Sequence, residues 1–197
     1  MNSTKKKNKL EEQTLKSEVI FKGNWLKVQR DHVRLPNGAE TFREYILHPG
    51  AALILPVLDD GRLLMIEQYR HPLKKIFLEF PAGKIDRGEN SLQTAHRELK
   101  EEVGVVSKDL KLMTQIHPVI GYSNELIDLY LARDLTFHEA KPDPNEFLNT
   151  IEVKFTDAMD MLKSGKISDV KSAMALFWYD KIINSSWRTF HPTSVGK

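Results

Sequence analysis

Hydrophobic and polar positions alternate from residue 14 to residue 35, which predicts two or three short strands. The sequence Pro36-Asn37-Gly38 is a strong turn signal, and residues 39–47 resume the alternation as another strand. These strands precede the most apolar part of the chain. We therefore expect a small antiparallel sheet that is separate from the main core.

Two apolar runs follow and are joined by the turn sequence Asp59-Asp60-Gly61, so we expect a hairpin over residues 51–70. Later strands are expected over residues 110–119, 126–131 and 150–155, and helices over residues 91–103, 157–165 and 169–183. Because strands and helices mix without a strict strand-helix-strand repeat, the expected fold class is α/β. We expect a mixed β-sheet sandwiched between helices, with the small N-terminal antiparallel sheet as an extension.

The helices are predicted with defined ends and faces. The first lacks Pro and Gly from Ser91 to Val103; Asn90 or Ser91 can cap its start, and Gly104 its end. Its expected apolar stripe consists of Leu92, Ala95, Leu99 and Val103. Thr156 is expected to cap the second helix, and Asp169 or Ser172 the third. The third helix is expected to turn Ala173, Leu176, Phe177 and Tyr179 inward.

Three glutamates of the first helix lie along the edge of its apolar stripe. Glu98 and Glu102 are about 40° apart on one face, and Glu101 lies about 60° to the other side of Glu98. Like charges four residues apart destabilise a helix, so another group must offset their repulsion. Divalent cations that prefer oxygen ligands are candidates, and a solvated glutamate-rich surface helix is the alternative.

The amino-acid composition limits the class of protein to which the chain can belong. With 197 residues, 41% of them apolar, the chain has the size of one globular domain with a small extension. It has no run of about 18 apolar residues, so we expect no membrane span. It also has no cysteine, which excludes disulfides and thiolate metal sites and agrees with a cytoplasmic location.

Charge is concentrated at the start of the chain. The net charge is +2, but the first ten residues carry four lysines and no acid, and the rest has 25 basic and 27 acidic residues. We therefore expect no nucleic-acid binding by the folded part. The expected organisation is a disordered basic tail (1–13), an N-terminal extension (14–47), a main domain (48–187) and a flexible tail (188–197).

Residues 83–105, GKIDRGENSLQTAHRELKEEVGV, carry the most specific motif. Gly83 is followed after five residues by Glu89, and seven residues later by Arg97-Glu98-Leu99, Glu101-Glu102 and Gly104-Val105. This pattern resembles the Nudix box of the Nudix hydrolases at every defining position. The order of elements over residues 45–185 also resembles the Nudix fold. The resemblance implies attack of water on a phosphorus atom of a pyrophosphate.

Four further segments, EQYR, LEFPAGKIDRGE, GYSNE and KISD, resemble the ADP-ribose pyrophosphatase branch. That branch cleaves nucleoside diphosphate sugars to a nucleoside monophosphate and a sugar phosphate. It implies a homodimer built by the N-terminal extension. Many of its members carry a proline two residues before the GYS segment, whereas this chain has Ile120 before Gly121 and a proline only at Pro118. Nucleoside diphosphate sugars other than ADP-ribose therefore stay open.

The resemblance also implies site residues. Glu98, Glu102 and Glu101, with the main-chain carbonyl of Ala82, would bind Mg²⁺, or Mn²⁺ as an alternative, with two or three ions present alongside the substrate. Arg97 would orient the box carboxylates by a salt bridge, and Glu89 would brace the preceding loop. Substrate-binding candidates are Arg70, Arg43 and Glu79, and the aromatic side chains that could stack on the base are Trp25, Tyr69 and Tyr122.

The general base is expected on the loop after residues 126–131, where Glu146 is the best-placed glutamate and Asp143 is nearby. Two other functions are weighed against this one. Hydrolysis of nucleoside triphosphates or capped RNA disagrees with the near-neutral folded part. A nucleotide-sugar sensor without catalysis disagrees with the presence of all three box glutamates.

Overall fold

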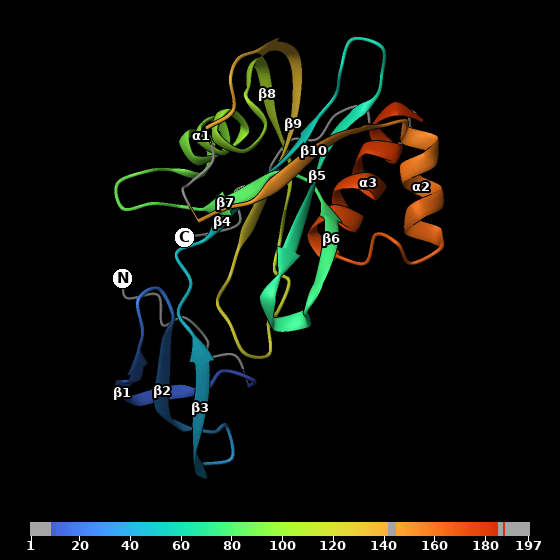
Figure 1. The fold of residues 1–197 in the computed structure, drawn as a ribbon. Helices are drawn as coiled ribbons and strands as arrows, with labels where there is room; N and C mark the ends of the chain where they lie inside the picture. Colours follow the sequence, from blue (N-terminus) through green and yellow to red (C-terminus); the bar gives the residue numbers. More distant parts are fainter. Residues whose placement is uncertain (1–8, 142–144, 185–186, 188–197) are drawn as a thin grey trace, which may run out of the picture. The chain divides into compact units, whose positions relative to one another are not determined.

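The computed structural model describes residues 9–141, 145–184 and 187, and its contacts divide the chain into two units (Figure 1). The first unit comprises the chain up to His48 together with Val119–Glu125. The second comprises Pro49–Pro118 and the chain from Leu126 onward. Of the two tails expected to be disordered, residues 1–8 and 188–197 lie outside the described residues.

The first unit is a three-stranded antiparallel sheet in the order β1-β2-β3. Its strands are β1 (Gln13–Lys22), β2 (Lys27–Arg34) and β3 (Glu40–Ile46). In the turn between β2 and β3, Gly38 has φ +88° and donates its N–H to the carbonyl of Leu35. The segment 119–125 joins the end of β3, where the N–H of Ile46 donates to the carbonyl of Tyr122 at 2.8 Å. The expected N-terminal antiparallel sheet is confirmed.

The second unit contains two sheets. One is four-stranded, in the order β7-β4-β9-β8, from β4 (Ala51–Pro56), β7 (Ala82–Lys84), β8 (Val105–Ile116) and β9 (Ile127–Phe137). The other has the order β10-β5-β6, from β5 (Leu63–Arg70), β6 (Lys75–Glu79) and β10 (Leu148–Val153). Strands β4 and β9 are parallel and the other pairs are antiparallel, so the four-stranded sheet is mixed.

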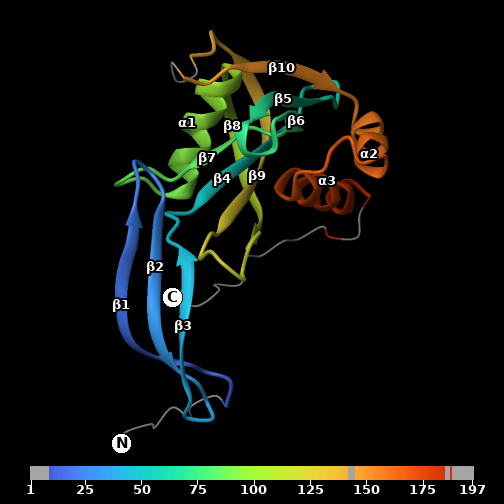
Figure 2. The same cartoon turned by 60° about the horizontal axis from the view of Figure 1, so that its bottom comes forward.

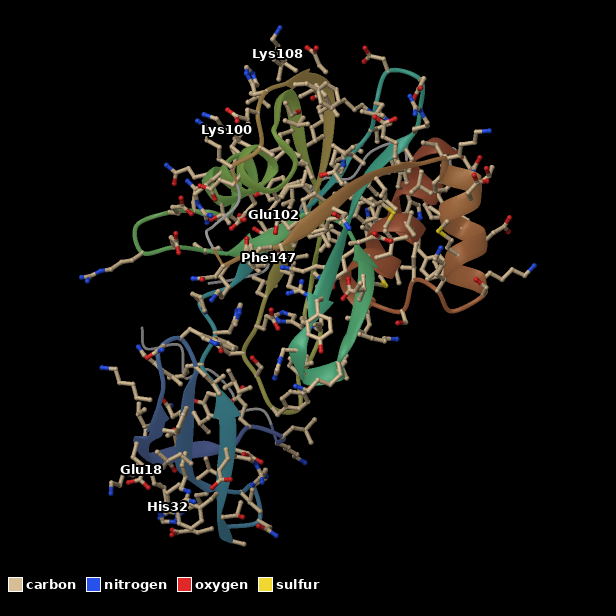
Figure 3. All side chains as sticks on the ribbon, viewed as in Figure 1. Glu18, His32, Lys100, Glu102, Lys108 and Phe147 are labelled. Carbon is tan, nitrogen blue, oxygen red and sulfur yellow. The ribbon has the colours of Figure 1, made fainter. Side chains whose placement is uncertain are left out.

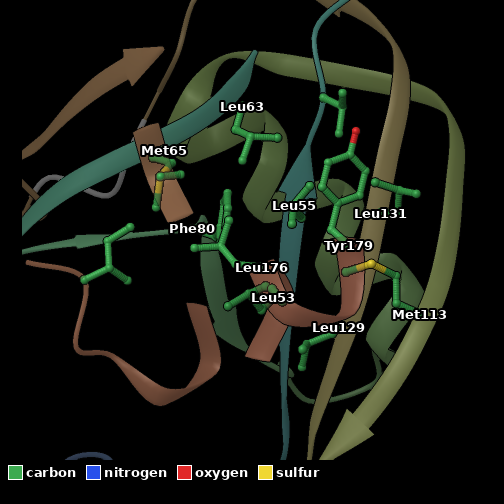
Figure 4. Packing of buried hydrophobic residues seen from close by; sticks show 14 of the residues in the cluster. Leu53, Leu55, Leu63, Met65, Phe80, Met113, Leu129, Leu131, Leu176 and Tyr179 are labelled. Carbon is green, nitrogen blue, oxygen red and sulfur yellow. The ribbon is translucent and has the colours of Figure 1, made fainter. Parts of the chain in front are cut away.

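Three α-helices complete this unit: α1 (Ser91–Val103), α2 (Phe155–Lys163) and α3 (Val170–Ile183), with a short 3₁₀ helix, η1 (His71–Leu73). Alternate residues of β4 pack into different clusters. Leu53 belongs to the cluster that contains Leu176 of α3, and Ile54 to the cluster that contains Leu99 of α1. Figure 2 shows strands lying between α1 and α3, and Figure 4 shows the α3-side cluster. The expected sheet sandwiched between helices is confirmed.

The hairpin expected over residues 51–70 is wrong. The turn is present, and Val57 forms one isolated bridge with Leu63, but β4 and β5 then separate into different sheets. All of β4 and the first half of β5 are buried. Strands that are buried on both faces have no alternation of polar and apolar residues to specify which strand they pair with. The turn sequence therefore predicts that the chain reverses direction, but not that the two strands pair.

Three details of the helices also differ from the expectation. Leu92, expected in the apolar stripe of α1, is 42% exposed. Phe177 was expected inward and is 49% exposed, because the buried face of α3 consists of Ser172, Ala175, Leu176 and Tyr179. Helix α2 begins at Phe155 with Lys154 as its N-cap, so Thr156 is already inside the helix. Among the helices in the described ranges, none is long and apolar enough to cross a membrane.

Candidate active site

Helix α1 is fixed at both ends by its own sequence. The Asn90 side chain accepts a hydrogen bond from the N–H of Gln93, and the Gln93 side chain accepts one from the N–H of Asn90, which is a capping box. At the other end Gly104 has φ +66°, and an added Cβ would lie 2.5 Å from the carbonyl oxygen of His138. Asn90 is therefore the N-cap among the two expected, and Gly104 is required by both conformation and space.

The two central glutamates of α1 are buried. Glu98 is 8% exposed and Glu102 is 4% exposed, and Figure 3 shows Glu102 beside β7. A Cβ on Gly83 would lie 1.7 Å from Oε1 of Glu98, so only glycine allows this carboxylate to lie directly on the β7 backbone. Oε2 of Glu102 accepts a hydrogen bond from the N–H of Ala82 at 3.0 Å. Gly83 thus leaves the space that the Glu98 carboxylate occupies.

Arg97 connects three carboxylates of the box. Its Nε and Nη2 donate to the two oxygens of Glu89 at 3.0 and 3.1 Å. Its Nη1 donates to Glu98 at 2.7 Å and to Glu101 at 3.1 Å, and Nη2 also reaches the carbonyl of Lys84. The guanidinium lowers the pKa of Glu89 to about 2, with help from the Thr94 hydroxyl. Arg97 therefore contacts the box carboxylates directly, and its orienting role and the bracing role of Glu89 stay predictions.

Glu98 and Glu102 are short of positive charge. Burial raises the pKa of Glu98, and the nearby Arg97 only partly offsets this, while Glu101 and Glu146 raise it further. Burial raises the pKa of Glu102 well above its ordinary value, and repulsion from Glu98 and Glu146 adds to this. Buried carboxylates that repel one another require a cation to stay ionised together.

The donor set fits a magnesium ion. Across the described ranges, no group of three or more His, Asp or Glu side chains is arranged to hold a metal by itself. Mg²⁺ needs less, because it commonly binds through one or two carboxylates and completes its shell with water and substrate phosphates. Glu98 and Glu102 supply such a pair, and Glu101 is the half-exposed third glutamate of the box. The Ala82 peptide lies at Glu102, and its carbonyl stays a predicted ligand.

Arg70 and Glu79 form a bidentate ion pair at the end of β5. Nε of Arg70 donates to Oε1 of Glu79 at 2.8 Å, and Nη2 donates to Oε2 at 2.7 Å. The Arg70 guanidinium also interacts electrostatically with Glu102, so it lies within reach of the box carboxylates. Lys171 also pairs with Oε2 of Glu79. Arg70 and Glu79 are therefore brought together, and near the metal candidates.

Glu146 follows a segment that is tied to the end of α1. The N–H of His138 donates to the carbonyl of Gly104 at 2.7 Å, and the N–H of Lys141 donates to the carbonyl of Glu101 at 3.1 Å. The Glu146 carboxylate is half-buried and acts electrostatically on Glu98 and Glu102. The expected general base thus lies within electrostatic range of the expected metal ligands, and its role stays a prediction. Asp143 lies outside the described residues.

The remaining candidates belong mostly to the first unit. Arg43 makes a bidentate pair with Glu12, with Nη2 to Oε1 at 2.6 Å and Nε to Oε2 at 3.0 Å. Its role toward a substrate stays a prediction. The three aromatic candidates are all exposed: Trp25, Tyr69 and Tyr122.

Sequence reasoning gave Lys171 no role at the start of α3 and considered Ser172 only as a helix cap. Lys171 holds Glu79, and the Ser172 hydroxyl accepts a hydrogen bond from the N–H of Phe80 at 3.0 Å. One signal was available. A lysine in the first turn of a helix opposes the helix dipole, so it indicates a nearby carboxylate that compensates for it.

The fold agrees with comparisons with known proteins. The family model described as NUDIX domain matches residues 47–176, and the model of the nucleoside diphosphate sugar hydrolase N-terminal domain matches residues 12–46. The chain belongs to the NUDIX domain family, and the resemblance stated from its sequence is confirmed.

Two relatives and one solved structure are particularly informative. An ADP-ribose pyrophosphatase of Bacillus subtilis (strain 168) is 38% identical over 169 residues, which cover 85% of this chain and 91% of that protein. A methanol dehydrogenase activator of Bacillus methanolicus is 39% identical over 168 residues, covering 84% and 91%. The crystal structure of an ADP compounds hydrolase matches with a TM-score of 0.81 and 26% identity, and covers 93% of this chain and 100% of that one.

Proposed function

We propose that this protein is a divalent-metal-dependent hydrolase that cleaves the pyrophosphate bond of ADP-ribose or a related nucleoside diphosphate sugar. The products are a nucleoside monophosphate and a sugar phosphate. The observation that carries the proposal is the charge-deficient pair of buried glutamates, Glu98 and Glu102, which lies within electrostatic reach of Arg70. Such a site offers carboxylates for cations and a guanidinium for phosphate, which is what a pyrophosphate substrate requires.

Glu98 and Glu102 would hold the ions, with Glu101 and the Ala82 carbonyl as further ligands and Mg²⁺ as the favoured metal. When bound, the metal supplies charge neutralisation at the phosphate oxygens and lowers the pKa of the attacking water. Arg97 keeps the Glu98 carboxylate in place through its hydrogen bond at 2.7 Å. The proposal includes both this set of metal ligands and the binding of two or three ions.

Substrate binding and proton transfer fall to other residues. Arg70 would bind a phosphate oxygen while Glu79 holds its guanidinium from the opposite edge. Glu146 would take a proton from the attacking water, because its carboxylate lies within electrostatic range of Glu98 and Glu102. Arg43, on the first unit, would contact the nucleotide.

A hydrolysis panel tests this function. ADP-ribose, ADP-glucose, GDP-mannose, UDP-glucose, NADH and ATP are incubated with the protein and Mg²⁺, and products are separated by chromatography. We expect a nucleoside monophosphate and a sugar phosphate from the diphosphate sugars. Glu102→Gln removes one carboxylate charge with little change in shape, and should lower kcat by about a thousandfold.

The matched control is Glu139→Gln, which removes a charge from a side chain that is 84% exposed. It should leave turnover unchanged. Cleavage of ATP alone would replace the proposal with the triphosphate hydrolase alternative. The absence of cleavage of every compound at any Mg²⁺ concentration would favour a sensor without catalysis.

A second candidate function is activation of a dehydrogenase, because one relative of similar identity is named a methanol dehydrogenase activator. The rate of a methanol dehydrogenase can be measured with and without this protein. If wild-type protein raises that rate and Glu102→Gln does not, the activation depends on the same hydrolytic site. If both raise it equally, activation is a separate function.

We also propose that the protein is a homodimer in the cytoplasm, with the first unit contributing the interface. In the part of this unit that the structure describes, only Asp31 and Val33 are buried. The sheet exposes large apolar side chains, namely Val19, Ile20, Phe21, Trp25 and Phe42. A three-stranded sheet without a core needs a further apolar surface to be stable.

Light scattering after gel filtration tests the dimer. We expect twice the mass of one chain at micromolar concentration, and a shift toward one chain for Phe21→Asp. Phe137→Asp, which changes a comparably exposed aromatic of the second unit, should keep the larger mass. A wild-type protein with the mass of one chain would contradict the proposal.

A further inference from the structure

Four charged side chains of the second unit form a group centred on Glu79, which is 2% exposed. Arg70 donates to both oxygens of its carboxylate at 2.8 and 2.7 Å. Lys171 pairs with Oε2 of Glu79 and, at 2.8 Å, with Oδ2 of Asp169. The buried carboxylate is therefore held by two cations, one from the end of β5 and one from the first turn of α3.

The place of Lys171 in its helix is unfavourable by itself. It is the second residue of α3, where the aligned peptide dipoles present partial positive charge. Asp169, the N-cap, accepts a hydrogen bond from the N–H of Ser172 at 3.0 Å and also pairs with Lys171. The Lys171 side chain is only 15% exposed. Its ion pairs with Glu79 and Asp169 offset this unfavourable position.

The same turn of α3 also holds the backbone that leads into the box. The hydroxyl of Ser172 accepts a hydrogen bond from the N–H of Phe80 at 3.0 Å, and both residues are fully buried. Two residues further on, the N–H of Ala82 donates to Glu102. The start of α3 is thus in contact with the side chain and the backbone of the segment that runs from Glu79 to the predicted metal ligands.

Arg70 has one edge left for a ligand. Its Nε and Nη2 are used by Glu79, and Nη1 makes no hydrogen bond to any residue that the structure describes. The side chain is 39% exposed. A guanidinium fixed at one edge by a carboxylate presents its remaining N–H groups in a defined direction, which suits a phosphate oxygen.

We propose that Lys171 is a positioning residue for substrate binding: it fixes the Glu79 carboxylate so that Arg70 keeps its Nη1 edge toward the pyrophosphate. This inference rests on the proposed function. Without Lys171, Glu79 retains a single cationic partner and Arg70 loses the rigid support of its Nε edge. Lys171 acts through Glu79 and Arg70 and does not touch the substrate.

Steady-state kinetics with ADP-ribose test the inference. Lys171→Met should raise KM about tenfold, the effect of one charge-assisted hydrogen bond, and should change kcat by less than about twofold. Lys171→Arg, which keeps the charge, should restore most of the affinity. Lys166→Met, at an exposed lysine just before α3, is the matched control and should behave like the wild type.

A double-mutant cycle separates positioning from a general structural role. If Lys171 acts through Arg70, then adding Lys171→Met to Arg70→Lys should raise KM no further than Arg70→Lys alone. Multiplied effects in the double variant, or a wild-type KM in Lys171→Met, would overturn the inference. Should Lys171→Met fail to fold, Lys171→Gln keeps a donor at this position without the charge, and it takes the same place in the cycle.

The wild-type rate distinguishes the two proposals. Absence of ADP-ribose and nucleotide-sugar hydrolysis by the wild type would overturn the proposed function and this inference with it. Wild-type hydrolysis together with an unchanged KM in the Lys171 variants would overturn the inference alone.

Discussion

Two glutamates of the second unit, Glu79 and Glu102, are almost equally buried, at 2% and 4% exposure, and their pKa values shift in opposite directions. Burial raises the pKa of both carboxyls. At Glu79, Arg70 and Lys171 outweigh it and lower the pKa overall. At Glu102 the neighbouring Glu98 and Glu146 add to the effect of burial.

The difference separates a buried carboxylate whose charge is compensated within the protein from one whose charge is not. Glu79 has its cations within the protein, so it serves as a fixed support for Arg70. Glu98 has only Arg97, which does not fully offset its burial, and at Glu102 repulsion from carboxylates adds to burial, so the two need a cation from solution to stay ionised together. The same residue type at the same depth therefore supports a side chain in one place and requires a metal in the other.

The largest effect on turnover should come from Glu146, the third carboxylate near the uncompensated pair Glu98 and Glu102. Glu146→Gln removes the group proposed to accept the proton of water, and should lower kcat by about a thousandfold at saturating Mg²⁺ with little change in KM. Glu139→Gln, on the segment that leads to Glu146, is the control because its side chain is exposed. Turnover of Glu146→Gln close to the wild-type rate would show that another group is the base.

A stability comparison tests the two glutamates directly. Glu79→Gln leaves Arg70 and Lys171 without their shared anion, and should lower the free energy of unfolding by about 2 kcal/mol. This is below the range for fully buried pairs because Arg70 is partly exposed. Glu102→Gln removes an uncompensated charge and keeps an oxygen for the Ala82 N–H. In EDTA it should leave the free energy of unfolding unchanged or raise it by about 1 kcal/mol.

Urea unfolding in EDTA and in Mg²⁺ provides the measurement. Mg²⁺ should stabilise the wild type and have a smaller effect on Glu102→Gln, because only the native wild-type site binds the ion well. If Glu102→Gln in EDTA lost more stability than Glu79→Gln, the distinction between compensated and uncompensated carboxylates would be wrong.

The sequence predicted the uncompensated carboxylates of the box much better than the compensated carboxylate Glu79. Gly83, Glu98 and Gly104 lie in one continuous motif, and their roles depend on local geometry, namely helix spacing, a close approach and a helix end. The partners of Glu79 come from elements far apart in the chain, and one of them, Lys171, is 92 residues away. No spacing rule connects such residues. The wrong hairpin has the same origin, because the pairing of fully buried strands is decided by tertiary packing.

Glu89 offers a third, more exposed case of a compensated carboxylate, and the smallest expected effect. Arg97 and Thr94 lower its pKa from 4.5 to about 2 in the folded protein. A carboxyl with a lowered folded pKa contributes stability that is fully present above its unfolded pKa and is lost as the pH falls through the folded value. The contribution of Glu89 should therefore be complete at pH 6 and disappear between about pH 4.5 and pH 2.

Thermal unfolding of the wild type and Glu89→Gln across this range measures the contribution. We expect the variant to have the lower midpoint at pH 6, and the two midpoints to converge as the pH approaches 2. Asp86→Asn is the matched control, because Asp86 lies 3.7 Å from Arg97 and its side chain is 71% exposed. It should follow the wild type at every pH, since exposed pairs contribute little. A difference between Glu89→Gln and the wild type that stayed constant from pH 6 to pH 2 would mean that Glu89 stabilises the loop through shape and hydrogen bonding, and not through its charge.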